Sequence, residues 1–95
     1  MIEIMTFRLL PGADEADFLA ADRLVQIEFA YQQPGLLRRT TARAEHGDWI
    51  VIDLWRSAED ASAADARFGQ DPVTASFLSF VDHASIATAR YDTVD

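Results

Sequence analysis

The stretch that decides the fold is WIVIDLWR, residues 49–56. Successive side chains of a β-strand point to opposite faces, so this stretch divides into two sets. One set is Ile50, Ile52 and Leu54, and the other is Trp49, Val51, Asp53 and Trp55. Both sets are apolar apart from Asp53, whereas a strand with one solvated face shows a polar set. The pattern therefore predicts a central strand of a sheet that is covered on both faces.

Turn-forming residues on either side of this strand divide the rest of the chain into further elements. Pro11-Gly12 and Pro34-Gly35 are breaks, residues 45–48 form a hairpin turn around Gly47, and Ser57 and Asp71 are suitable helix N-caps. We expect strands over 2–9, 36–44, 49–56 and 83–91, and helices over 14–32, 58–68 and 72–82. This βαββαβ order, with the last helical region broken near Gly69, predicts an α+β, ferredoxin-like domain with an antiparallel sheet over residues 1–95.

The long first helix has a broad apolar side in this interpretation. Its apolar residues are Phe18, Leu24, Val25, Ile27, Phe29 and Tyr31, with Asp22 assigned to the polar side. Two helical regions in a 95-residue chain cover only one face of a sheet. The other face needs a cover, and the simplest cover is the same face of a second copy. The sequence thus predicts a homodimer formed through the sheet faces; the alternative is a monomer whose bowed sheet is wrapped by residues 92–95.

Composition excludes several classes of function. The chain has 16 acidic residues against 8 basic ones and a net charge of −8, which disfavours binding to nucleic acid. It has no Cys and no Lys, which excludes disulfides, thiolate chemistry and Schiff bases. No apolar stretch is long enough for a membrane span and no signal peptide is visible, so a cytoplasmic location is expected. With two distant His residues, a metal site is not expected.

Several short motifs resemble those of the antibiotic biosynthesis monooxygenase (ABM) superfamily. They are Pro34-Gly35-Leu36, Trp55-Arg56-Ser57 leading to Ala61, and then Pro72 and Phe77. The resemblance covers residues 2 to 90 and implies a dimeric α+β barrel, in which two ferredoxin-like sheets close around a shared interior. It also implies a pocket between sheet and helices, lined by Trp55, with Ile50, Ile52 and Leu54 forming the dimer seam.

The resemblance is incomplete at positions tied to chemistry. Cofactor-free quinone-forming members carry an Asn where Val51 stands and a Tyr near Ala61. Haem-degrading members carry a His where Asp65 lies and an Asn near Met5. This chain has none of these four residues.

Asp53 is the main catalytic candidate. A carboxylate on an apolar face is desolvated and its pKa rises, which suits a general base near neutral pH. The alternative is an Asp paired with Arg38 or Arg90 on a neighbouring strand. Trp55 is a candidate for stacking on an aromatic substrate, or else fills the core.

The remaining candidates have structural alternatives. His83 is a candidate acid or base, or a structural residue near a helix end, whereas His46 lies in a turn and is expected to be solvated. Trp49, Phe68 and Phe77 are candidate substrate contacts, or core residues. Arg38, Arg39 and Arg43 on one strand would either bind an anion or pair with the abundant acids.

These features lead to competing hypotheses of function. The first is a cofactor-independent monooxygenase acting on a small aromatic, quinone or polyketide-like compound. The second is a non-catalytic dimer that binds a small hydrophobic ligand or has a purely structural role, and the third is a haem-degrading monooxygenase.

Overall fold

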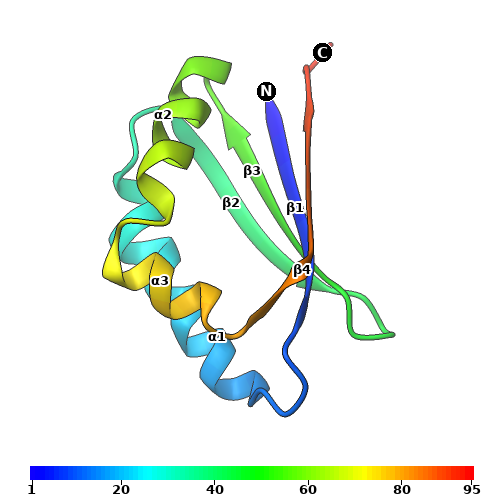
Figure 1. Cartoon of the computed structure of the whole chain (residues 1–95). Helices are drawn as coiled ribbons and strands as arrows, with labels where there is room; N and C mark the ends of the chain where they lie inside the picture. Colours follow the sequence, from blue (N-terminus) through cyan, green and yellow to red (C-terminus); the bar gives the residue numbers. More distant parts are fainter.

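Four strands form one antiparallel sheet in the order β2-β3-β1-β4, in a computed structural model that describes residues 1–95 (Figure 1). The strands are β1 (Ile2–Leu9), β2 (Leu36–Arg43), β3 (Trp49–Trp55) and β4 (Val81–Tyr91). The helices are α1 (Glu15–Leu24), α2 (Ala58–Phe68) and α3 (Pro72–Leu78). The ferredoxin-like prediction is confirmed, with β1 and β3 in the centre and β2 and β4 at the edges.

All helices cover the same face of the sheet (Figure 1). The main core lies between the two layers and contains Phe7, Phe18, Val25, Trp49, Val51, Phe77 and Val81. Phe18 contacts Trp49 and Phe77 at ring-centroid distances of 4.9 and 5.3 Å, so aromatic side chains join α1, α3 and β3. On the opposite face, Ile50, Ile52 and Leu54 remain partly exposed and no helix covers them.

The first helical region is not one regular helix. After α1 the chain continues as a π-helical turn over Val25–Phe29 and a 3₁₀ turn over Ala30–Gln32. Val25 and Phe29, the first and last residues of the π turn, are both buried. The predicted apolar side was therefore wrong in part, because Leu24 and Ile27 are 47% and 56% exposed.

The end of the second helical region also differs from the prediction. Helix α3 ends at Leu78 rather than at Asp82, and β4 begins at Val81, two residues before His83. Val81 pairs with Leu9 and is almost fully buried in the core, so pairing with β1 ends the helix early.

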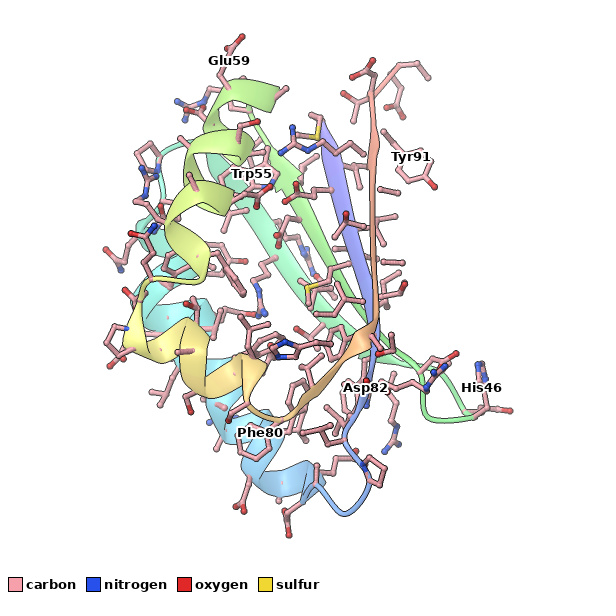
Figure 2. The ribbon with its side chains drawn as sticks, viewed as in Figure 1. His46, Trp55, Glu59, Phe80, Asp82 and Tyr91 are labelled. Atoms are coloured by element: carbon pink, nitrogen blue, oxygen red, sulfur yellow. The ribbon has the colours of Figure 1, made fainter.

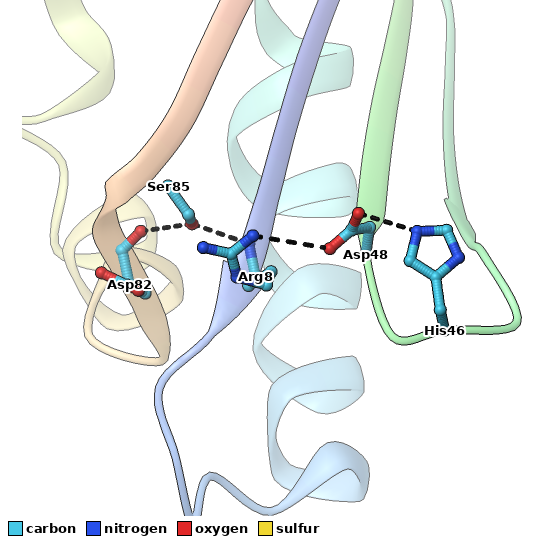
Figure 3. A network of polar contacts seen from close by, with 5 residues as sticks. All are labelled: Arg8, His46, Asp48, Asp82 and Ser85. Carbon is cyan, nitrogen blue, oxygen red and sulfur yellow. Dashed lines mark hydrogen bonds and ion pairs between the residues drawn. The ribbon is translucent and has the colours of Figure 1, made fainter.

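A β-bulge between Thr6 and Arg8 shifts the register of β1 against β4. The backbone N–H of Arg8 donates to the Ser85 hydroxyl at 2.8 Å, and that hydroxyl donates to the Asp82 carbonyl at 2.6 Å (Figure 3). A side chain therefore satisfies the donor at the irregularity. Beside it, the exposed His46 pairs with Asp48 at 2.9 Å, which agrees with its prediction as a solvated turn residue.

Candidate functional site

A cavity of about 560 Å³ opens between the sheet and the helices. Its apolar wall consists of Met5, Val51, Phe68, Phe77, Leu78 and Ile86. Its polar lining is dominated by charged residues, namely Glu3, Arg39, Asp53, Asp65 and Arg90. A cavity of this size, apolar with a few polar groups, is typical of a small-molecule site.

Four of the charged residues form one row across the sheet. Asp53 of β3 pairs in register with Arg39 of β2 and with Glu3 of β1, and Glu3 pairs with Arg90 of β4. Directly opposed residues on neighbouring strands share a face, so all four side chains project toward the helices. From the β2 edge to the β4 edge, the floor of the cavity therefore carries Arg39, Asp53, Glu3 and Arg90.

Arg39 is held by partners outside the cavity. Its guanidinium donates to Asp22 Oδ1 at 2.7 Å and to Gln26 Oε1 at 3.3 Å, and it lies 5.9 Å from the centre of the Phe77 ring. Both Arg39 and Asp22 are buried, at 6% and 8% exposure. Asp22, assigned to the polar side of its helix from the sequence, is instead buried because it neutralises this arginine.

Arg90 is also fully engaged. Its Nε donates to Glu3 Oε2 at 3.0 Å, one terminal nitrogen to Asp65 Oδ2 at 2.9 Å and the other to Ser62 Oγ at 3.1 Å. The pKa of Glu3 is raised to about 7. Burial is the main cause, the neighbouring Asp65 carboxyl adds to the rise, and Arg90 opposes both effects. Arg90 therefore links β1 and β4 to α2 across one end of the cavity.

Asp53 is the one charged residue of this row that has no ion-pair partner. Its Oδ1 is buried and has no hydrogen-bond partner. The pKa of Asp53 is raised to about 6. Burial is the main cause, Arg39 opposes the rise, and Asp65 and Asp22 add to it. The predicted alternative, an ion pair with Arg38 or Arg90, is wrong, because Arg90 binds Glu3 and Asp65 while Arg38 is exposed and donates to Thr40.

The other predicted site residues fall into two groups. Phe68 and Phe77 line the cavity together with Asp53, although both also pack against the core. Trp55 lies under α2 against Ala61 and Ala64 (Figure 2) and borders a separate void of about 30 Å³ rather than the main cavity. Its indole N–H is buried without a partner.

Trp49 and His83 lie outside the cavity. Trp49 is 6% exposed and packs edge-on against Phe18, where it fills the core. His83 is exposed, and its Nε2 lies 2.9 Å from the Leu78 carbonyl oxygen, so it joins the start of β4 to the end of α3. The structural alternatives considered for these two residues account for their positions.

Sequence reasoning missed Glu3 and Asp65 as lining residues, and it named Arg90 only as a partner of Asp53. Arg39 was a candidate for binding an anion or pairing with acids, and it pairs with Asp22. A signal for Glu3 existed, because it shares strand parity with Met5 and Phe7 and so belongs to the helix-covered face. No such signal places Arg39, Glu3 and Arg90 beside Asp53, because that depends on the register of three strand pairs.

Comparison with solved structures shows what this arrangement resembles. The cofactor-independent oxygenase SnoaB from Streptomyces nogalater superposes with a TM-score of 0.80 at 17% identity, over 99% of this chain and 92% of that one. An antibiotic biosynthesis monooxygenase superposes with a TM-score of 0.75 at 15% identity over all of both chains. Rv0793 from Mycobacterium tuberculosis gives a TM-score of 0.70 at 13% identity, over 99% and 94% of the two chains.

This chain has the ABM fold. No family model matches the sequence, and no curated protein matches it. Within the ABM fold the helix-facing side of β3 borders the cavity, as the motif resemblance implied, but here Asp53 rather than Trp55 lines it. None of the helices combines the length and apolar character needed to cross a membrane.

Proposed function

We propose that this protein is a cofactor-independent monooxygenase acting on a small hydroxylated aromatic or polyketide-like compound. The observation that carries the proposal is Asp53, which lines this partly aromatic cavity and whose carboxylate, with Oδ1 buried, has no hydrogen-bond partner in the protein. The overall likeness to SnoaB, named as a cofactor-independent oxygenase, supports the same reaction class. Neither His46 nor His83 lines the cavity, so it offers no imidazole to a haem iron.

Asp53 would act as the general base. With a pKa near 6 it is ionised at neutral pH, yet it is a stronger base than an ordinary aspartate. A phenolic ring with a keto tautomer carries an acidic CH₂ group, and loss of one proton to Asp53 leaves a resonance-stabilised carbanion. The partly exposed Phe68 would contact such a ring, while the buried Phe77 supports the wall from the core.

Oxygen then completes the reaction with electrons from the substrate. The carbanion transfers one electron to O₂, and the carbon radical and superoxide join to form the C–O bond of a peroxide anion. This anion takes the proton back from Asp53, giving a hydroperoxide and the ionised Asp53 again. Loss of the second proton from the same carbon breaks the O–O bond, forming a ketone and releasing water. The balance is CH₂ + O₂ → C=O + H₂O, so no external reductant is required.

Oxygen uptake with a panel of hydroquinones and polycyclic phenols tests this proposal. We expect uptake by the wild type, and a loss of roughly 10²–10⁴-fold in the Asp53→Asn variant, the usual contribution of a general base. The wild-type rate should rise with pH through about 6 as Asp53 ionises. Glu45→Gln, which removes an exposed carboxylate from the hairpin turn, is the matched control and should retain full activity.

Other outcomes of this assay would contradict the proposal. Equal rates for the wild type and Asp53→Asn would remove Asp53 from the mechanism. Saturable binding of the aromatic compounds without oxygen uptake would instead support the non-catalytic ligand-binding alternative.

We further propose that two copies pair through the uncovered sheet face. Ile2, Ile4, Ile50, Ile52 and Leu54 lie on that face, because Ile2 and Ile4 pair in register with Leu54 and Ile52. These five large apolar side chains remain partly exposed in a single chain. Covering such a contiguous patch with its own copy removes it from water, which favours a symmetric dimer.

A further inference from the structure

We propose that the cavity selects a neutral ring carrying hydrogen-bond donors and rejects its carboxylated analogue. This inference rests on the proposed function, since it names the charge class of the substrate for the same site. It follows from the charges that line the cavity and from the partners those charges already have.

The lining carries more negative than positive charge. Glu3, Asp53 and Asp65 contribute three carboxyl groups, against the two guanidinium groups of Arg39 and Arg90. Asp22, bonded to Arg39 at 2.7 Å, adds a further carboxylate directly behind the floor. An anion entering this space meets like charges, and of these the buried Asp53 and Asp22 are the least screened by water.

Both arginines of the lining are already paired with carboxylates of the protein. Arg90 donates through all three of its guanidinium nitrogens, to Glu3, Asp65 and Ser62. Arg39 donates to Asp22 and Gln26. A carboxylated ligand would have to compete for guanidinium groups that already neutralise carboxylates of the protein.

The buried carboxylate of the lining that lacks a partner is an acceptor, Asp53. Asp53 lines the cavity, and no protein group donates to its carboxylate, so a ligand that supplies an O–H to it pairs an acceptor that otherwise remains without a donor. The apolar wall of Met5, Val51, Phe68 and Phe77 suits an uncharged ring. A neutral phenol meets both requirements, whereas an arene carboxylate meets only the second.

Calorimetric titration with 2-naphthol and 2-naphthoate at pH 7.5 tests this inference. The two probes share one ring system but differ in charge, and neither needs to react with oxygen. We expect the wild type to bind 2-naphthol about tenfold or more tightly than 2-naphthoate. Asp53→Asn should narrow this ratio by relieving the repulsion of the carboxylate, while the surface control Glu45→Gln should leave it unchanged.

The outcomes separate this inference from the proposed function. Equal or tighter binding of 2-naphthoate, or no binding of 2-naphthol at millimolar concentration, would overturn the charge selectivity. Selective binding of 2-naphthol in a protein that consumes no oxygen with any phenol would uphold the selectivity while contradicting the monooxygenase.

Discussion

Two neighbouring residues of the sheet, Arg39 and Asp53, show how differently the fold treats buried charge. Arg39 is paired with Asp22 and bonded to Gln26, whereas the Oδ1 atom of Asp53 has no partner at all. A paired buried charge is tolerated, but an unpaired carboxylate is destabilising because it has lost its hydration. Stability alone would not select an aspartate at this position.

Asp53→Asn should therefore stabilise the protein at neutral pH. The folded-state pKa of about 6 exceeds the ordinary aspartate pKa of 3.8, so folding binds a proton between these values. The contribution of Asp53 to stability is fully present below pH 4 and is lost as pH rises through 6. A shift of this size corresponds to about 3 kcal/mol, an upper figure because partial exposure of the side chain reduces it.

Urea denaturation of both proteins at pH 4 and pH 7.5 measures this effect. We expect the variant to be more stable by about 1–3 kcal/mol at pH 7.5, with a smaller difference at pH 4. A variant less stable than the wild type at pH 7.5 would show that the Asp53 carboxylate has a stabilising partner.

Arg90 controls the second titrating carboxyl of the cavity. Its Nε lies 3.0 Å from Glu3 Oε2 and opposes the rise in the pKa of Glu3. Arg90→Gln should therefore raise the pKa of Glu3 above 7, which is measurable by ¹³C NMR titration of the side-chain carboxyl. Arg56→Gln, at an exposed position, is the control, and an unchanged or lower midpoint in Arg90→Gln would contradict the assignment.

At the level of elements, glycine decides how β2 begins beside α2. Gly35 has φ +85°, and a Cβ built on it would lie 2.7 Å from the Cβ of Asp60 in the first turn of α2. Gly47 has a similar φ of +96° but open space around it. An alanine at either position would have the same backbone strain, but only an alanine at position 35 would also clash with a neighbouring residue.

Gly35→Ala and Gly47→Ala form a matched pair for this difference. We expect Gly47→Ala to cost about 1 kcal/mol in free energy of unfolding, from the left-handed backbone alone. Gly35→Ala should cost at least about 2 kcal/mol more, because α2 must move away from β2. Equal losses in urea denaturation would show that the helix adjusts without strain.

The whole molecule is a sheet with helices on one side only, which leaves Ile50, Ile52 and Leu54 without cover from their own chain. This asymmetry is the structural basis of the proposed dimer. The cavity borders Val51 and Asp53, whereas the proposed dimer seam contains Ile50, Ile52 and Leu54. Because these two sets alternate along β3, the cavity and the seam lie on opposite faces of the sheet.

Ile52→Arg should disrupt self-association while leaving the fold intact. Its side chain sits at the centre of the apolar patch, where a charge opposes burial against a second copy. Sedimentation equilibrium at micromolar protein should give a dimer for the wild type and a 10.6 kDa monomer for the variant. Ala66→Arg, on an exposed position of α2, should remain dimeric. A monomeric wild type would refute the dimer.

Element order, most element boundaries and the two faces of β3 follow from the sequence by itself. Turn residues such as Pro34-Gly35 mark the breaks, and alternation assigns Asp53 to the helix-covered face. These are local properties, since they depend on backbone preferences and on a period of two residues.

The site depended on tertiary structure. Strand parity says which face Glu3 and Arg90 occupy, but only the pairing registers place them in one row with Asp53 and Arg39. Those registers are shifted by irregularities in the β1–β4 and β2–β3 pairs. Likewise, Asp22 is buried only because Arg39 lies opposite it. Long-range pairing decides which charges are neutralised, and so which one, Asp53, is left without a partner.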